Sequence, residues 1–424
     1  MSELAINGGE KVITKPFPDV GDISGRYLGQ EEKELLIEVI NSGHLNRVGG
    51  TKVSQFEKEF AERYGVRHAI ASSSGTAALH IALGALALNP GDEVITTTIT
   101  DMGTVIAILL CNAIPIFADV DPLTCNIDPE SIEGKITEKT RVIIPVHLFG
   151  QPSNMDPIIE ISKRHNLYIV EDCCQAHLAE YKGEMVGTMG DIGCFSFQQS
   201  KQITTGDGGM TIMNDDELAE RSRLFSDKGW PRTNNGQRDH LFLGPNYRMT
   251  ELQGAVGIAQ IRKIDSIVQK RRETAQFLTN LIKNIEGVNP PKIIEGAIHS
   301  WWNYSFTINE ELLKVSSRDF QNALNAEGIP FHVGYIPNPI FSYEVIKSRK
   351  TYGTSHCPWD CPQARQNIQY KKEDYPNTMK AIEKVFVMNW NEGITYDNSR
   401  DIGNGLEKVA AYFQKRIRAL PKRN

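Results

Sequence analysis

The sequence predicts an α/β protein in which a mostly parallel sheet is covered by helices and is followed by a smaller α+β domain. The chain has 424 residues, which is too long for one compact core, so two domains are expected. Between residues 67 and 171, short apolar runs alternate with helical segments, as in the strand–helix units of a parallel sheet. After one long helical segment at 250–285 the order of elements changes. We therefore predict a large α/β domain with an N-terminal arm at 1–265 and a small α+β domain at 266–424.

The elements of the large domain follow a polar arm at residues 1–28. Helices are predicted where apolar side chains recur at helical spacing, as Val53, Phe56 and Phe60 do, and strands where short apolar or β-branched runs occur. The expected helices are 29–42, 51–64, 77–88, 102–111, 131–136 and 156–165, and the expected strands are 67–71, 93–97, 114–118, 141–146 and 167–171. In the small domain the expected strands are 301–308 and 330–333, and the expected helices are 317–327 and 405–420, around an irregular Pro-rich stretch.

Composition and charge exclude several classes of protein. A hydrophobic content of 40% and a charged content of 23% are those of an ordinary globular protein. The net charge of −6 gives no polycationic surface, so no nucleic-acid partner is expected. The first residues lack the basic region and the apolar region that a secretory signal peptide requires. The longest apolar run, around 105–110, is too short to span a bilayer, so no membrane association is expected.

The cysteines favour a reducing compartment. There are seven, scattered along the chain and odd in number, which favours free thiols and a cytoplasmic location. The segment 356–361 contains His356, Cys357 and Cys361, but a zinc site needs about four ligands from paired motifs, and no second pair exists. We interpret this segment as a loop and predict no metal site.

A single lysine, Lys201, lies in the stretch 194–210, after hydroxylic and aromatic residues and before three glycines. An amine in a partly enclosed and mostly uncharged setting has a pKa that falls toward neutrality, which suits Schiff-base chemistry. The glycines allow a tight turn or a close approach of the backbone to a ligand. Taken alone, the stretch is better explained by a surface lysine before a glycine turn.

Polar residues at two strand ends make a ligand-binding role for Lys201 more plausible. The segment 72–78, with Gly75 and Thr76, ends a strand and opens a helix, where free amides and the positive helix end suit a phosphate. An ordinary helix N-cap explains the same residues equally well. Asp172 follows the apolar strand 167–171 and would suit a metal, a salt bridge, a helix cap or a cationic ring nitrogen. Gln175, three residues later, could donate a hydrogen bond to a phenolate oxygen of the same ligand.

Together, these features match the needs of pyridoxal 5'-phosphate. In an open α/β sheet, ligands bind beyond the carboxyl ends of the strands. A phosphate cradle, the aspartate and a lysine at that edge supply what this cofactor requires, because its ring accepts electrons only while the ring nitrogen stays protonated. Lys201 would hold the cofactor and then move a proton once an amino substrate has displaced it. No G-x-G-x-x-G follows the first strand, which argues against a dinucleotide-binding dehydrogenase.

Several motifs in this order resemble the sugar-aminotransferase family called DegT/DnrJ/EryC1/StrS, which has the fold-type I aminotransferase scaffold. The resemblance is strong over residues 30–260 and weaker elsewhere. The motifs that carry it are Ser73-Ser74-Gly75-Thr76-Ala77-Ala78-Leu79, Gly91-Asp92-Glu93-Val94-Ile95, Asn126-Ile127-Asp128-Pro129, Pro145-Val146-His147-Leu148-Phe149-Gly150, Glu171-Asp172 with Gln175, Phe195-Ser196-Phe197 with Lys201, Gly206-Asp207-Gly208-Gly209 and Gly244-Pro245-Asn246-Tyr247-Arg248-Met249.

The resemblance implies a role for each matching position. Lys201 would be the Schiff-base lysine, Asp172 would pair with the pyridine nitrogen, and Gln175 would contact the ring hydroxyl. The residues implied to hold the phosphate are Gly75, Thr76 and Ser196, with Asn246 reaching the phosphate in the neighbouring subunit of a homodimer with shared active sites. The dehydratase branch of the family carries histidine at the position of Lys201, so the lysine indicates amino transfer.

One position departs from the family pattern. Members usually carry an aromatic residue that stacks on the cofactor ring shortly after the strand 93–97, and here Asp101 stands at that position. Either Met102 or another residue covers the ring, or this branch makes a polar contact there.

We predict a pyridoxal-phosphate-dependent transaminase that moves an amino group from glutamate or glutamine to a keto group of a cyclitol or sugar. The run 198–201 slightly favours a keto-cyclitol such as scyllo-inosose. A nucleotide-sugar aminotransferase remains the alternative among enzymes, and a non-catalytic regulatory protein that binds the cofactor is the alternative outside them. The stretches 299–304 and 332–337 are candidate substrate-side loops, although aromatic residues of a small-domain core fit there equally well.

Overall fold

The structure is a computed structural model that describes residues 3–232 and 239–418. Its largest sheet has seven strands in the order β1-β9-β8-β5-β4-β2-β3. These strands are β1 (His68–Ser72), β2 (Glu93–Thr97), β3 (Ile114–Ala118), β4 (Thr140–Ile144), β5 (Tyr168–Asp172), β8 (Ile192–Ser196) and β9 (Gly209–Met213). Only β9 runs antiparallel to its neighbours; the other adjacent pairs are parallel. This arrangement confirms the predicted α/β fold with a mostly parallel sheet.

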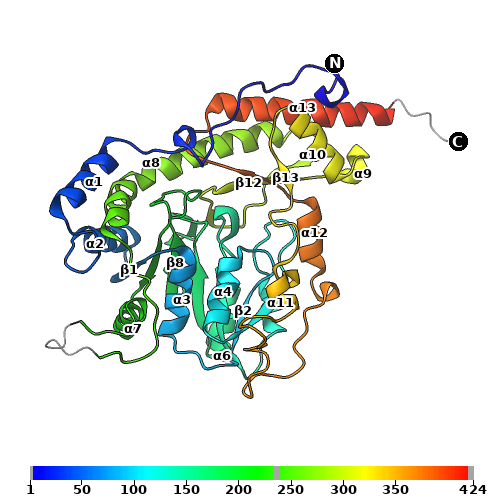
Figure 1. Cartoon of the computed structure of the whole chain (residues 1–424). Coiled ribbons are helices and arrows are strands. Elements are labelled where there is room, and N and C mark those ends of the chain that lie inside the picture. The colour runs from blue at the N-terminus through cyan, green and yellow to red at the C-terminus, as the bar shows by residue number, and fades with distance from the viewer. Residues whose placement is uncertain (1–2, 233–238, 419–424) are drawn as a thin grey trace.

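Helices bury both faces of this sheet (Figure 1). On one face lie α3 (Gly75–Ala85), α4 (Met102–Leu110) and α7 (Asp216–Ser226), and on the other lie α2 (Lys52–Tyr64), α5 (Pro129–Glu133), α6 (Met155–His165) and part of α8 (Glu251–Ile282). Successive side chains of a strand point to opposite faces. Accordingly, Val142 and Ile144 pack with α3 and α4, whereas Ile143 between them packs with α6.

The long helix α8 joins this sheet to a second layer. Its first half packs with α2 and the large sheet through Ile258, Ile261 and Ile264, and its second half packs in another core through Leu278 and Ile282. That second core lies around a four-stranded antiparallel sheet with helices α10 and α13, and Figure 1 shows α8 and α13 side by side. The predicted division at residue 265 falls inside α8 and remains a prediction.

The remaining elements are short or lie outside the large sheet. The four-stranded sheet consists of β10 (Val288–Asn289), β12 (Asn303–Ile308), β14 (Phe386–Asn389) and β13 (His332–Val333), and a small three-stranded sheet consists of β11 (Ala297–Ile298), β6 (Glu180–Tyr181) and β7 (Glu184–Met185). The other helices are α1 (Gln30–Ser42), α9 (Glu310–Leu313), α10 (Ser317–Ala326), α11 (Glu344–Lys347), α12 (Pro376–Lys384) and α13 (Tyr396–Arg418).

The predicted bounds of the terminal helix are wrong at its start. The helix was predicted to begin at Gly405, but α13 begins at Tyr396 and contains both Gly403 and Gly405. A Cβ on Gly405 would lie 2.2 Å from Cδ1 of Ile329, so this glycine allows α13 to pack closely against Ile329 in the second core. Residues 419 and 420 of the prediction lie outside the described residues.

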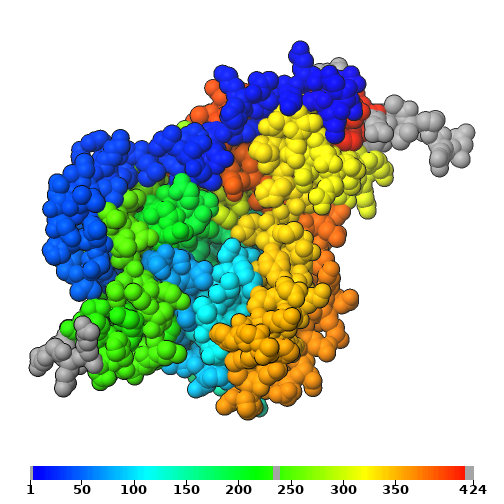
Figure 2. Space-filling model, viewed as in Figure 1, coloured from blue at the N-terminus to red at the C-terminus, as the bar shows by residue number. Residues whose placement is uncertain are grey.

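Two segments far apart in the sequence return to pack beside other parts of the fold. The Pro-rich segment 340–375 buries Phe341, Trp359 and Tyr375 against side chains of the large sheet (Figure 2, orange beside cyan). The N-terminal arm lies beside the end of α10, where the amide of Ala5 donates to Oε1 of Glu327 at 2.8 Å. Within the described residues, no helix is long and apolar enough to cross a membrane.

Candidate active site

The carboxyl ends of β1, β2, β5 and β8 meet at one edge of the large sheet, as expected for parallel strands. A cavity of about 440 Å³ opens there. Of the predicted site residues, those that line it are Gly75, Thr76, Asp172, Gln175, Ser196 and Lys201. Asn246 does not line it: this residue is exposed and pairs with Asp227 through a β-bridge. Six of the seven predicted residues thus surround a common space.

The start of α3 forms one wall of the cavity. Ser74 caps this helix, because its Oγ accepts a hydrogen bond from the amide of Ala77 at 3.0 Å. The first amides of a helix have no acceptor within the helix, so those of Gly75 and Thr76 are available to a ligand. A Cβ on Gly75 would lie 2.7 Å from Cβ of Ser196 and 2.9 Å from Sγ of Cys174. Glycine therefore lets the Ser196 hydroxyl lie directly against the helix end, which suits a phosphate group.

Asp172 is buried at the end of β5 and is held by two donors. Oγ1 of Thr104 donates to its Oδ2 at 2.8 Å, and the amide of Cys174 donates to its Oδ1 at 3.1 Å. Oγ1 of Thr104 also lies 2.9 Å from Oγ1 of Thr100. Thr104 has one hydroxyl proton, and the carboxylate can only accept, so Thr100 donates to Thr104. The two threonine hydroxyls thus fix the orientation of the Asp172 carboxylate, which lines the cavity.

Gln175 is also held in place. Its Oε1 accepts from the amide of Phe149 at 2.8 Å, and its Nε2 donates to the hydroxyl of Tyr335 at 3.3 Å. One of the two Nε2 protons is therefore free of these contacts. The geometry leaves this donor able to reach a ligand oxygen in the cavity.

Lys201 lies in the loop between β8 and β9 and is nearly buried. Its Nζ lies 3.9 Å from the ring centroid of Trp302, which directly precedes β12 of the four-stranded sheet. Burial lowers the pKa of Lys201 below its usual value, and the negative charges of nearby groups, Asp101 and Asp172 among them, oppose that shift. The direction of the shift favours the neutral amine, the nucleophilic and basic form.

Two distant side chains hold the backbone of the lysine loop. Nη1 of Arg26, from the N-terminal arm, donates to the carbonyl of Lys201 at 2.7 Å, and Nε1 of Trp302 donates to the carbonyl of Ser200 at 2.9 Å. Arg26 in turn lies 3.6 Å from Glu392, which forms a fully buried ion pair with Arg271 of α8 at 2.6 Å. The position of Lys201 therefore depends on both halves of the molecule.

Sequence reasoning missed several of these groups. Thr104, Arg26 and Cys174 were not predicted as site residues, and Trp302 and Tyr335 were only members of two longer candidate stretches. In the first stretch His299, Trp301 and Tyr304 form a stacked series with centroids 4.0 and 5.3 Å apart, and none of the three lines the cavity. A threonine two residues into a helix carries no local signal of such a role, so only the contact with Asp172 identifies Thr104.

One cluster has the composition of a metal site. The ligand atoms of His147, Glu171 and Cys173 lie within 4.8 Å of one another and are buried. However, the carboxylate of Glu171 already accepts from the amides of Gly187, Met189 and Gly190 at 2.6–2.8 Å. Nδ1 of His147 accepts from the amide of Ser153 at 2.9 Å, so its Nε2 carries the proton and donates to Glu171 at 3.0 Å. The protein itself satisfies this cluster, which supports the strand end next to Asp172.

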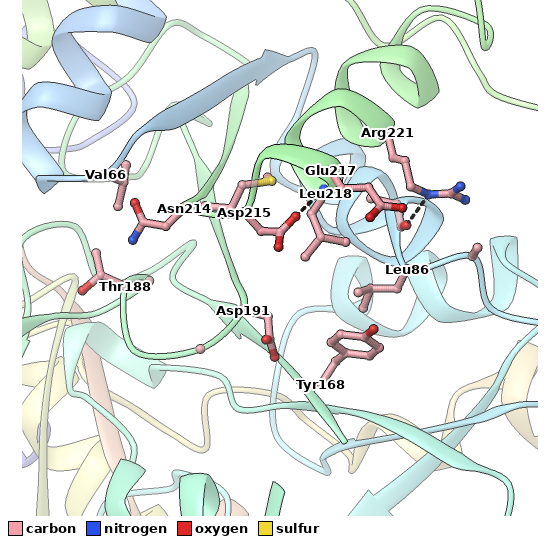
Figure 3. Close-up of a pocket in the computed structure, with 15 residues that line it drawn as sticks. Val66, Leu86, Tyr168, Thr188, Asp191, Asn214, Asp215, Glu217, Leu218 and Arg221 are labelled. Atoms are coloured by element: carbon pink, nitrogen blue, oxygen red, sulfur yellow. Dashed lines mark hydrogen bonds between the residues drawn. The ribbon is translucent and has the colours of Figure 1, made fainter. Parts of the chain in front are cut away.

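A second cavity, of about 540 Å³, lies at the opposite edge of the sheet. Figure 3 shows it between Tyr168 at the start of β5, Asp191 before β8 and Asp215 after the antiparallel β9. Asp191 accepts from the amide of Ile169 at 2.7 Å, and Arg221 donates to the carbonyl of Ala85 at 2.8 Å. These polar groups hold elements of the fold together and lie away from Lys201.

Comparison with known proteins agrees with the fold and the class of site. The model of the DegT/DnrJ/EryC1/StrS aminotransferase family matches residues 26–370. The chain is 37% identical over 421 residues to a Streptoalloteichus tenebrarius protein named "Putative L-glutamine:3-amino-2,3-dideoxy-scyllo-inosose aminotransferase", covering 96% of this chain and 97% of that protein. It is 38% identical over 371 residues to the GDP-perosamine synthase of Caulobacter vibrioides, covering 86% and 98%.

The solved structures agree with this result. An X-ray structure of the aminotransferase from Psychrobacter cryohalolentis superposes with a TM-score of 0.81 at 30% identity and covers 94% of this chain and 100% of that one. The neighbours share the fold-type I aminotransferase architecture, as predicted. The chain therefore belongs to the DegT/DnrJ/EryC1/StrS aminotransferase family and is an aminotransferase.

Proposed function

We propose that this aminotransferase uses pyridoxal 5'-phosphate to move an amino group from glutamate or glutamine to a keto group of a cyclitol or sugar. The observation that carries the proposal is the meeting of three groups on one cavity: the nearly buried amine of Lys201, the carboxylate of Asp172 and the free amides at the start of α3. An anion site, a basic site and a proton-pairing carboxylate are the groups that this cofactor requires of a protein.

The residues present fit the cofactor. The cradle of Gly75, Thr76 and Ser196 would hold the phosphate, because a side chain at Gly75 would fill it. Asp172 would pair with the ring nitrogen, and the free proton of Gln175 would meet the ring hydroxyl. When bound, pyridoxal phosphate supplies an electron-accepting ring that carries the amino group from one substrate to the other.

The chain's own residues account for the proton movements. Burial favours the neutral form of Lys201, so Nζ can accept the proton that leaves the α-carbon of the amino donor and return a proton at the end of the transfer. Trp302 and Tyr335, which line the cavity on the small-domain side, would exclude water from this amine. Thr104 and the amide of Cys174 hold the Asp172 carboxylate in place at the cavity.

The acceptor class rests on the relatives. The scyllo-inosose relative matches nearly the whole chain, and the run 198–201 also favours a keto-cyclitol. The GDP-perosamine synthase of similar identity supports the alternative, a nucleotide-sugar acceptor. We further propose a homodimer in which the exposed Asn246 reaches the phosphate site of the neighbouring subunit.

Visible absorption of the purified protein with pyridoxal phosphate tests the proposal. We expect a yellow band that glutamate or glutamine bleaches, and recovery of the band when scyllo-inosose or a keto nucleotide sugar is added. The first result identifies the donor and the second the acceptor. The variant K201A should fold normally by circular dichroism and show neither change. A protein that stays colourless with the cofactor, or a K201A variant with full turnover, would refute the proposal.

A further inference from the structure

The cavity around Lys201 has an excess of negative charge. Three of the described residues that line it are aspartates, Asp101, Asp172 and Asp207, and Lys201 is the only lysine or arginine among them. Asp172 has its proposed role toward the cofactor. The other two carboxylates are left facing the space that the substrates must enter.

Asp101 is exposed at the start of α4. Its Oδ1 caps the helix by accepting from the amide of Gly103 at 2.7 Å. No donor to its Oδ2 is found in the described parts of the chain. A Cβ on Gly103 would lie 3.0 Å from Oδ1 of Asp101 and 2.6 Å from Oγ1 of Thr76, so the carboxylate lies beside the proposed phosphate cradle. One oxygen of a charged side chain therefore remains free next to the reaction site.

The charge of Asp101 affects the pKa values of two other residues that line the cavity, Lys201 and Tyr335. It opposes the lowering of the Lys201 pKa, and it adds to the burial that raises the pKa of Tyr335. The helix end at α4 favours a negative charge at this position. A free, charged oxygen near the amine that performs the chemistry is a binding group for a cationic or hydrogen-bond-donating part of a substrate.

We propose that Asp101 makes the site select acceptors that carry an ammonium group in addition to the ketone. This inference rests on the proposed function and names its substrate class: amino-substituted keto-cyclitols or keto-sugars. An ammonium group would pair with the carboxylate, whereas a hydroxyl would leave the charge unpaired beside two other carboxylates of the cavity. The aromatic residue common at this position in the family could offer no such charged contact.

Binding without turnover tests this selection. The enzyme is first converted to its amino-cofactor form with glutamine. This form of the enzyme cannot react with amines or polyols. The dissociation constants of scyllo-inosamine and scyllo-inositol, which differ by one ammonium group, are then measured by titration calorimetry. We expect the amine to bind about two- to fivefold more tightly, because an ion pair with an exposed carboxylate contributes up to about 1 kcal/mol.

Two variants separate the role of Asp101 from helix capping. Asparagine also caps helices, so D101N should keep α4 intact and abolish the preference for the amine, because the neutral amide cannot pair with the ammonium charge. The matched control is D128N, which changes the cap of α5, where Oδ1 of Asp128 accepts from the amide of Glu130 at 3.0 Å away from the cavity. This variant should keep the full preference.

The outcomes distinguish this inference from the proposed function. Equal affinity of the wild-type enzyme for the two ligands, or an unchanged preference in D101N, would overturn the role of Asp101 even if scyllo-inosose restores the yellow band. Failure of every keto-cyclitol and keto-sugar to restore the band would instead overturn the proposed function, whatever the two dissociation constants are.

Discussion

Thr104 supports the carboxylate that would pair with the cofactor, so removing its hydroxyl should weaken cofactor binding. The Oγ1–Oδ2 distance of 2.8 Å joins two buried groups, and the carboxylate of Asp172 also accepts from the amide of Cys174 at 3.1 Å. Hydrogen bonds to charged groups contribute about 1.5–3 kcal/mol, and about 1.4 kcal/mol corresponds to a tenfold change in affinity. For T104V, which keeps the shape of the side chain, we therefore expect the affinity for pyridoxal phosphate to fall about 10- to 100-fold.

The assay is an equilibrium titration of cofactor-free enzyme with pyridoxal phosphate, followed by the visible band. T104S retains the hydroxyl and should bind nearly normally. T100V removes a neutral donor one step further away, so a loss of about 1 kcal/mol, or roughly fivefold, is expected. T211V is the control, since Oγ1 of Thr211 donates to the carbonyl of Ala78 at 3.1 Å in the core. A T104V enzyme that binds the cofactor within twofold of the wild type would refute the reasoning.

Two further predictions concern packing and pH. G75A should lower the affinity for pyridoxal phosphate at least about tenfold, because the added Cβ meets Ser196 and Cys174 at 2.7 and 2.9 Å. The control G134A should bind the cofactor normally, since the nearest atom to its added Cβ lies 4.0 Å away. Equal affinities of the two variants would contradict the proposed phosphate cradle. Burial lowers the pKa of His80 from 6.5 to about 4, so the folded protein should lose stability as the pH falls from about 6.5 to about 4, by up to about 3 kcal/mol from this residue. In urea unfolding at pH 7 and pH 4.5, H80Q should lose less stability than the wild type on acidification, and parallel losses would show that His80 does not remain neutral in the fold.

Much of the architecture is predictable from local sequence. Alternating apolar runs and helical segments between 67 and 171 correspond to β1 through β5 at nearly the same bounds, because a strand buried on both faces is apolar throughout and its crossover helix keeps a helical period. The strands β8 and β9 were not predicted. They flank the lysine loop, and the reversed direction of β9 follows from its pairing between β1 and β8, which no local pattern encodes.

For the candidate site, residue types and their positions next to strands were enough to predict the chemical groups present. These are an amine in a glycine-rich loop, a carboxylate after an apolar strand, and small residues at the start of a helix. These follow from residue type and from position relative to a strand, both of which are local. Only the folded structure shows that Arg26 and Trp302 hold the lysine loop and that Thr104 holds Asp172. It also shows that Oδ2 of Asp101 has no donor among the described residues. These contacts join segments up to 175 residues apart, and packing, rather than any periodicity of the chain, brings such segments together.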